Sequence, residues 1–148
     1  MSYPGWPGAV QQQPRSASGP RAGFWRRFAA AFFDGIVLTL LNTILVVTLK
    51  GAGEVLDIVI AVAYYTVLEG GPRGQTLGKQ ALGIRVVSVE ADGPIGYRRG
   101  FIRFVGRYIS FLVLLLGYLW MLWDPERQCW HDKLAGDLVV PVSAYPLP

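Results

Sequence analysis

Residues 28–49 read FAAAFFDGIVLTLLNTILVVTL, an apolar run of 22 residues whose only charged side chain is Asp34. At about 1.5 Å per residue, a helix of this length spans about 33 Å, and the hydrocarbon core of a bilayer is about 30 Å thick. The alternative is a helix buried in the core of a soluble protein. A chain of 148 residues supplies too little polar surface to cover several such runs, so we predict a membrane-spanning helix here.

A second apolar run covers residues 55–68, VLDIVIAVAYYTVL, and approaches spanning length when it is extended to residues 52–70. Asp57 lies near its start. Tyr64 and Tyr65 lie toward its end, where tyrosines commonly mark a membrane interface. We predict a second transmembrane helix from this run.

A third apolar run covers residues 101–123, FIRFVGRYISFLVLLLGYLWMLW. Arg103 and Arg107 fall in its first two turns, and aromatic side chains gather at its far end, as in the aromatic belt of a membrane interface. The three runs together predict an all-α integral membrane protein with about three transmembrane helices. We assign the transmembrane domain to residues 24–142 and a short C-terminal tail to residues 143–148.

The overall composition excludes several classes of protein. The chain is 52% hydrophobic and 16% charged, against about 25% charged residues in a typical soluble domain. Its net charge of +4 is not gathered in a dense basic stripe, so we expect no nucleic-acid partner. One cysteine rules out an intrachain disulfide framework, and one histidine rules out a site that needs two.

Residues 1–23, MSYPGWPGAVQQQPRSASGPRAG, form a tail rich in proline, glycine and glutamine. This composition predicts disorder, and the lack of an apolar central region distinguishes the tail from a secretory signal. The tail either keeps the protein soluble or carries a short recognition motif for a protein partner around Tyr3 and Trp6.

Lysine and arginine residues flank the apolar runs unevenly. Four precede the first run, one lies in the first loop, five lie in the second loop and two lie in the C-terminal tail. Positive residues concentrate in cytoplasmic segments, so we predict a multi-pass cell-membrane protein with a cytoplasmic N-terminus and second loop. A single crossing by residues 101–123 then places the C-terminus outside.

Residues 84–90 and 138–142 suggest a different topology. Both runs are rich in β-branched residues and predict short strands, each of which would leave unpaired edges if it stood alone. Pairing requires both on one side of the membrane, so the third apolar run would have to enter and return, with a bend at Gly117. The charge pattern favours the single crossing, because the evidence for the strands is propensity alone.

Asp34 is the most informative polar residue. It lies about 10 Å into the first helix, where an aspartate costs about 2.5 to 3.5 kcal/mol on insertion scales and usually pairs with a cation. Arg27 lies two turns earlier on the same face, and Arg103 and Arg107 share one face of the third run. Asp34 is therefore a candidate ion or proton site, or one half of a structural ion pair, and Asp57 is a second candidate acid for cation entry.

The sequence offers no support for catalysis, so we expect a protein that is not an enzyme and has no cofactor. Residues 74–80, GQTLGKQ, lack the first glycine and the final serine or threonine of a phosphate-binding loop. Cys129, His131 and Asp132 offer three metal ligands without a fourth of the usual kind nearby, so we also expect no metal.

Three segments together resemble the RDD family of small membrane proteins. They are RRFA at residues 26–29 followed by Asp34, GQTLGKQALGIRVV at residues 74–87, and LLGYLWMLWDPERQCWHDKLAGDLVV at residues 115–140. The resemblance covers residues 24–142 and has the three apolar runs in the expected order. The family is named for an arginine at the start of the first helix, an aspartate within that helix and a later aspartate.

The resemblance assigns the arginine to Arg27, with Arg26 as the alternative, and the first aspartate to Asp34. The later aspartate is Asp124 or Asp132, in a motif that also holds His131. Many members have threonine after the LAG sequence, where this chain has Asp137. The family has no generally assigned function, although the resemblance implies transport, and a few members are associated with cation/proton antiport.

We therefore expect transport, or assistance to transport, of a small cation or solute, with Asp34 as the ion or proton site. Three helices are too few to enclose a pathway, so a homo-oligomer in the lipid bilayer is expected. The alternative is a membrane scaffold that does not transport and that recruits partners through its N-terminal tail.

Overall fold

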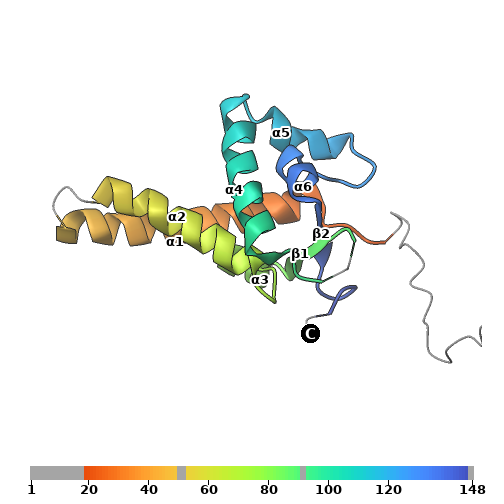
Figure 1. Ribbon diagram of the computed structural model, residues 1–148, viewed down its shortest axis with the longest axis horizontal. Coiled ribbons are helices and arrows are strands. Elements are labelled where there is room, and N and C mark those ends of the chain that lie inside the picture. Colours follow the sequence, from red (N-terminus) through yellow and green to blue (C-terminus); the bar gives the residue numbers. More distant parts are fainter. Residues whose placement is uncertain (1–18, 50–52, 91–92, 147–148) are drawn as a thin grey trace, which may run out of the picture.

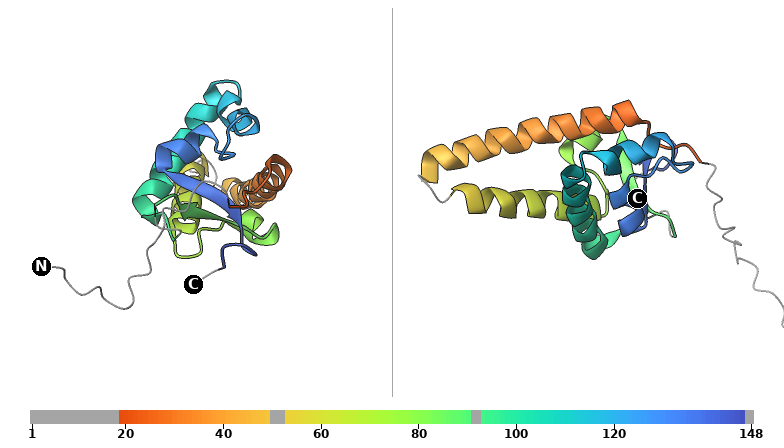
Figure 2. Two further views of the ribbon diagram at one scale, coloured as in Figure 1. Left: turned by 90° about the vertical axis from the view of Figure 1, so that its right-hand side faces the viewer. Right: turned by 90° about the horizontal axis from the view of Figure 1, so that it is seen from above.

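The computed structural model describes residues 19–49, 53–90 and 93–146, and the elements gather at one end of a long helical hairpin (Figure 1). The hairpin consists of α1 (Phe24–Leu49) and α2 (Gly53–Gly70). The remaining elements follow in the order α3 (Leu77–Ala81), β1 (Ile84–Ser88), α4 (Gly96–Leu112), α5 (Leu116–Leu119), the 3-10 turn η1 (Trp120–Leu122), α6 (Trp130–Ala135) and β2 (Asp137–Pro141). The views in Figure 2 show the hairpin projecting away from this group.

Helix α1 carries the membrane signal that the sequence predicts. Among the described helices, it alone is long and apolar enough by itself to cross a membrane. Only 11% of its most apolar stretch is buried inside the protein, so it differs from the core helix of a soluble protein. Large side chains such as Phe32, Leu40 and Val47 are exposed along it. Such a surface suits hydrocarbon better than water.

The other two predicted transmembrane segments are less regular. Helix α2 forms within the predicted residues 52–70, but its 18 residues include three acids, Glu54, Asp57 and Glu69. The third run passes the same length and hydropathy test only as α4 joined to α5 and η1, two pieces that meet at an angle of 111°.

The two predicted strands form and pair. β1 and β2 are antiparallel, and their register runs from Ile84 opposite Pro141 to Ser88 opposite Asp137. All five residues of β1 are buried. Side chains of both strands contribute to two apolar clusters, one joining Ile84, Val86 and Val139 with Ala30 of α1 and the other joining Val87, Leu138 and Val140.

This pairing favours a third segment that enters and returns over the single crossing predicted for residues 101–123. Paired strands lie side by side, so the chain between them must leave the sheet and come back. The return occurs at residues 113–115, where Leu114 and Leu115 have φ values of 51° and 63°. The bend therefore precedes Gly117 rather than falling on it. Gly117 packs so closely against Ser110 that a Cβ would lie 2.3 Å from its Oγ, and this contact folds α5 back onto α4.

We expect a reporter inserted after Glu90 and a reporter fused after Pro148 to lie on the same side of the membrane. The reason is that β1 and β2 share backbone hydrogen bonds, which cannot form across a bilayer. Protease protection of the two tags in sealed vesicles measures this directly. Tags on opposite sides would show that the strands do not pair in the membrane.

Some residues that the sequence assigned to the two tails are packed against the folded domain. Residues 1–18 lie outside the described part of the chain, but residues 19–23 pack against the sheet instead of remaining disordered. The Ala22 N–H donates to the Val139 carbonyl at 2.9 Å, and Arg21 forms an ion pair with Glu126 at 2.8 Å. Near the other end, Tyr145 packs against the second apolar cluster. Backbone pairing with β2 therefore extends the folded domain beyond the predicted residues 24–142.

Candidate functional site

The interior of the protein holds a group of buried charges centred on Arg103 of α4. The Arg103 Nε atom lies 2.9 Å from Oε2 of Glu69, and Nη1 contacts the carboxylates of Asp132 and Asp137. All four side chains are almost completely buried. Removing a charge from water costs several kcal/mol, so a buried cation is tolerated only where carboxylates surround it closely. Arg103 therefore ties together α2, α4, α6 and β2.

Glu69, in the last turn of α2, collects two further cations. Its Oε1 atom accepts from Lys79 Nζ at 2.5 Å and also contacts Arg107. Arg107 lies four residues after Arg103, so both guanidinium groups project from one face of α4. The Arg107 guanidinium also lies 4.3 Å from the centre of the Tyr65 ring, a cation–π contact.

Asp132 connects these charges to the first helix. Its Oδ2 contacts Arg27 of α1 and also accepts from the Cys129 N–H at 2.8 Å, which caps the start of α6. Burial acts to raise the pKa of Asp132, but the guanidinium groups of Arg103 and Arg27 hold this pKa well below its usual range. The same carboxylate therefore caps a helix and fixes two arginines.

We refer to these seven charged side chains as the ion cluster: Arg27, Glu69, Lys79, Arg103, Arg107, Asp132 and Asp137. Four are cations and three are carboxylates. Of the three carboxylates, Asp137 has the weakest compensation of its charge, because the Arg103 Nη1 atom that it contacts is also in contact with Asp132. Burial raises the pKa of Asp137 to about 7 despite the attraction of Arg103, and the neighbouring Asp132 adds to the rise.

Asp34 is held by neutral donors. Its Oδ1 accepts from the Tyr64 hydroxyl at 2.7 Å and from the Gly78 N–H at 2.8 Å, and its Oδ2 accepts from the Thr76 hydroxyl at 2.7 Å. Thr76 and Gly78 belong to the GQTLGKQ stretch, which therefore docks on a carboxylate rather than on a phosphate. Asp34 thus joins α1 to α2 and to the start of α3.

The predicted pairing of Asp34 with an arginine is wrong in the described part of the chain. Arg27 and Arg103 both contact Asp132, and Arg107 contacts Glu69. The physical reason is that three short hydrogen bonds already satisfy the carboxylate of Asp34, whereas the described residues give Asp132 one neutral donor, the Cys129 N–H, and Glu69 none.

Two other predicted acids lie apart from the ion cluster. Asp57 lies half-buried near the start of α2, whereas Glu69 lies at the end of that helix. Among the described residues, Asp57 has no ion pair with the cluster. Asp124 accepts from the N–H groups of Glu126 and Gln128 at 3.1 and 3.0 Å and pairs with Lys133, so it shapes the loop before α6.

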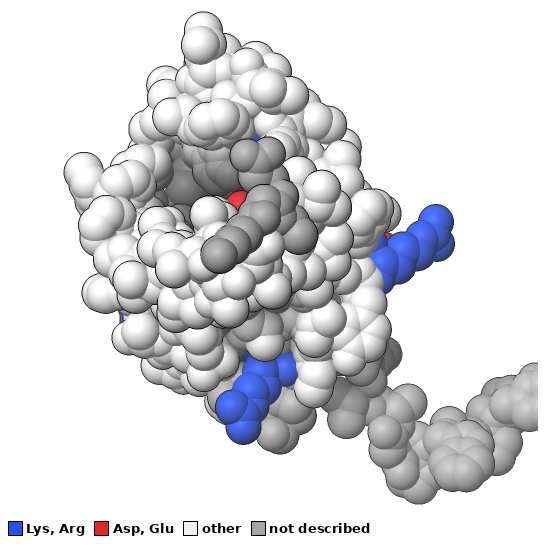
Figure 3. Space-filling view, turned by 90° about the vertical axis from the view of Figure 1, so that its left-hand side faces the viewer, with Lys and Arg blue, Asp and Glu red and all other residues white. Residues whose placement is uncertain are grey.

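A cavity of about 330 Å³ opens beside the ion cluster, between α1 and the α4–α5 unit. Figure 3 shows an almost uncharged face, viewed along the hairpin, with a hollow in it. Apolar and aromatic side chains make up most of the lining, together with six basic, acidic or imidazole side chains: Arg27, Asp34, Lys79, Arg103, Arg107 and His131. The cavity therefore joins an apolar space to the buried charges.

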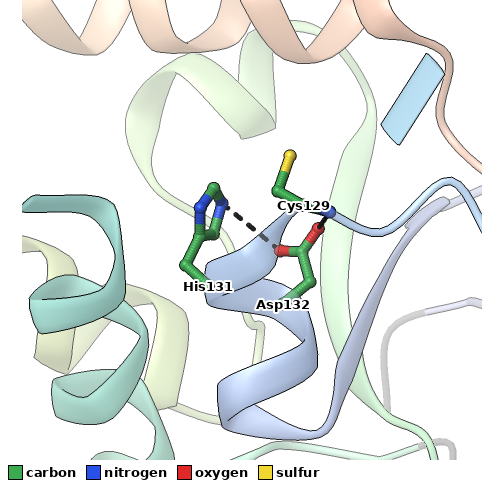
Figure 4. A group of neighbouring side chains, drawn as sticks. All are labelled: Cys129, His131 and Asp132. Atoms are coloured by element: carbon green, nitrogen blue, oxygen red, sulfur yellow. Dashed lines mark hydrogen bonds and ion pairs between the residues drawn. The ribbon is translucent and has the colours of Figure 1, made fainter. Parts of the chain in front are cut away.

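Cys129, His131 and Asp132 lie together, and one ligand atom from each falls within 4.8 Å of the others (Figure 4). Their chemistry does not suit a metal ion. Burial raises the pKa of the Cys129 thiol to about 12, so it stays protonated, and both Asp132 oxygens already contact arginines. Burial lowers the pKa of His131 well below its usual range, so its imidazole is neutral.

The family model that describes the RDD family matches residues 21–136, which include α1, the Asp34 site and most of the ion cluster. The chain belongs to the RDD family. It is 34% identical to the uncharacterized membrane protein YteJ of Bacillus subtilis over 139 residues, covering 84% of this chain and 83% of YteJ. It is 27% identical to the uncharacterized protein YxaI of the same organism, covering 80% of this chain and 96% of YxaI.

A shorter match links this RDD protein to a mycobacterial relative. The proline-rich antigen homolog of Mycobacterium tuberculosis is 33% identical over 72 residues, which are 49% of this chain and 30% of that protein. No solved structure matches. The membership and the apolar α1 identify the chain as a membrane protein of the RDD type.

The geometry distinguishes the alternatives for the RDD residues. Arg27 reaches the ion cluster, whereas Arg26 donates to the Leu82 carbonyl at 2.8 Å near the surface. Of the later aspartates, Asp132 contacts Arg27 and Asp124 does not. In this RDD protein the first-helix arginine therefore meets Asp132.

Three members of the ion cluster were missed as site residues by the sequence reasoning: Glu69, Lys79 and Asp137. Glu69 offered a signal, because an acid at the end of an apolar run needs a cation when buried. Lys79 offered none, since its stretch was compared only with a phosphate-binding loop. Asp137 was visible as a departure from the usual threonine, without an indication of its partner.

Proposed function

We propose that this RDD protein transports, or assists the transport of, a small charged solute that enters the cavity beside α1. The supporting observation is the cavity itself, which joins an apolar space of about 330 Å³ to Asp34 and the ion cluster. Ionisable groups are costly within a membrane and are retained mainly where they serve a pathway or a packed bundle.

Asp34 is the proposed proton or cation site. Its Oδ2 is held by the Thr76 hydroxyl, which can accept a hydrogen bond as readily as it donates one. A proton arriving on Oδ2 would therefore reverse this bond without moving either heavy atom. The Tyr64 hydroxyl offers the same freedom at Oδ1, while the Gly78 N–H is a fixed donor that keeps the carboxylate in place.

A pathway across the membrane requires more than one copy of the chain. The long helices α1, α2 and α4 are too few to surround a solute, and α1 leaves large apolar side chains exposed along its length. We therefore propose a homo-oligomer, which crosslinking in native membranes would detect as a discrete band. The alternative function as a scaffold depends on residues 1–18, which lie outside the described part of the chain, and stays a prediction.

We expect Asp34→Asn to fold and to lose proton-coupled flux. Asparagine keeps Oδ1 for the Gly78 N–H and the Tyr64 hydroxyl, and its amide can donate to the Thr76 hydroxyl in a reversed bond, so the expected loss of stability is about 1 kcal/mol or less. The measurement is sodium-driven proton movement in liposomes, followed with an internal pH dye.

Asp57→Asn is the matched control, since it makes the same substitution on α2 away from the ion cluster. It should retain flux. Wild-type flux in a well-folded Asp34→Asn protein would remove Asp34 from the mechanism, and absence of flux in the wild type would favour the scaffold.

A further inference from the structure

We infer that the cavity binds an amphiphilic anion, in which an oxyanion head group, a carboxylate or a phosphate, carries a hydrocarbon chain. This inference goes beyond the proposed function, because binding requires only the cavity and not proton exchange at Asp34. Charge, unpaired hydrogen-bonding atoms and the apolar wall carry it.

The charges that face the cavity are mainly positive. The side chains of Arg27, Lys79 and Arg107 line it and keep 10%, 8% and 15% of their surface exposed. The carboxylates that pair with them, Glu69 and Asp132, are fully buried behind them. A ligand in the cavity therefore meets the cations and not their partners.

One acid, Asp34, also lines the cavity, but the charge that a ligand meets there remains mainly positive. Its two oxygens already accept three hydrogen bonds from the protein. Its charge is therefore spread over fixed donors of its own, while the guanidinium groups retain donors to spare.

Three polar atoms of lining residues are buried without a hydrogen-bond partner in the described part of the chain. Nε of Arg103 still faces the carboxylate of Glu69 at 2.9 Å, whereas Nη1 of Arg107 and Nδ1 of His131 have no ion-pair partner of this kind. A buried polar atom without a partner is destabilising, so a small shift of either side chain toward a ligand in the cavity would be favourable. Arg107 Nη1 is a donor and fits an oxyanion oxygen.

The unpaired Nδ1 atom of His131 requires a hydrogen-bond donor instead. The Nε2 atom of His131 lies 3.4 Å from Oδ1 of Asp132 (Figure 4), and we assign the single proton of the neutral imidazole to Nε2, which leaves Nδ1 as an acceptor. A ligand with a hydroxyl next to its charged oxygen satisfies both atoms. A phosphate monoester that keeps one proton has this pair of groups.

The remainder of the cavity is suited to a hydrocarbon chain. Its wall includes Phe28, Phe111 and Leu115, which are also among the exposed apolar side chains of the protein surface. In a bilayer these side chains contact lipid, so the cavity is continuous with the hydrocarbon phase. A chain attached to the head group can therefore extend along the wall, whereas a free inorganic anion would leave the apolar surface uncovered.

The test is binding of decyl phosphate to the full-length protein in phosphatidylcholine nanodiscs, measured by thermophoresis. Three matched probes separate the sources of affinity: decanol has the chain without the charge, decyltrimethylammonium has the opposite charge, and inorganic phosphate has the charge without the chain. We expect decyl phosphate to bind at least about tenfold more tightly than each of them, since hydrogen bonds to a charged group are worth about this factor or more.

Two variants locate the site. Arg107→Gln removes the unpaired donor and should weaken decyl phosphate binding about tenfold or more, whereas Arg98→Gln, at an exposed position of the same helix, should not change it. Because Arg107 also pairs with Glu69, Ala31→Phe provides a second route. It fills the cavity from an exposed position of α1, and Ala63→Phe on an exposed position of α2 is its control.

Several results would overturn the inference. One is equal binding of decanol and decyl phosphate, and another is binding unchanged in a folded Arg107→Gln or Ala31→Phe protein. Inorganic phosphate binding as tightly as decyl phosphate would assign the site to a soluble anion instead of an amphiphile. Decyl phosphate binding without proton flux would leave this inference standing and refute the proposed function, and flux without binding would do the reverse.

Discussion

Arg103→Met is expected to lower the free energy of unfolding by about 3 to 5 kcal/mol, because it leaves buried carboxylates without their shared cation. Arg103 is 1% exposed and contacts Glu69, Asp132 and Asp137. Methionine fills most of the volume but supplies no charge. The measurements are the melting temperature in detergent and the folded yield from membranes.

Arg98→Met is the matched control, because it removes the same side chain from an exposed position of α4. It should leave both measurements near wild type. The double variant Arg103→Met with Asp137→Asn should recover part of the loss, since it removes one of the carboxylates left unpaired. If Arg103→Met melts at the same temperature as Arg98→Met, Arg103 is not the centre of the fold.

Local sequence patterns were sufficient for the elements formed by long apolar runs or by β-branched runs. The run at residues 28–49 and the run at residues 55–68 lie within α1 and α2, and the strands at residues 84–90 and 138–142 form almost where they were expected. In each case the pattern has the period or the length of the element that it forms.

The bend at residues 113–115 had no such signal. The sequence there is VLL within a longer apolar run, and leucine rarely adopts the positive φ values that Leu114 and Leu115 have. The bend is imposed by contacts made elsewhere, namely strand pairing at the sheet and the close packing of Gly117 on Ser110. Such contacts are remote in sequence, so local propensity cannot reveal them.

The candidate site shows the same limit. The sequence pointed to four charged residues of the site, because ionisable groups are costly within apolar runs. They are Arg27, Asp34, Arg103 and Arg107. Their partners were assigned by helical spacing, which orders residues on one helix but not between helices. The neutral donors of Asp34 lie 30 to 44 positions away in the chain, and neither a tyrosine or threonine hydroxyl nor a glycine N–H marks itself in the sequence as the partner of an acid. Only the folded arrangement shows which carboxylate meets which cation.

Gly78→Ala is expected to detach α3 from α1 and to destabilise the protein by about 1 to 3 kcal/mol, the usual cost of overpacking. A Cβ at this position would lie 2.0 Å from the Ala30 carbonyl oxygen and 2.9 Å from Oδ1 of Asp34. The first neighbour is helix backbone and cannot move aside, so α3 must shift. The shift stretches the hydrogen bonds that Thr76 and Gly78 donate to Asp34.

Gly35→Ala on α1 is the control, because a Cβ there meets nothing within 4 Å. It should keep or slightly raise the melting temperature, since alanine favours a helix over glycine by about 1 kcal/mol. Detachment of α3 should also speed tryptic cleavage after Arg73, at an exposed position just before the docked stretch. A Gly78→Ala protein with wild-type melting and cleavage would mean that α3 does not pack on α1 in the membrane. Asp34 would then lack two of its three donors and would be open to the cation that the sequence first suggested.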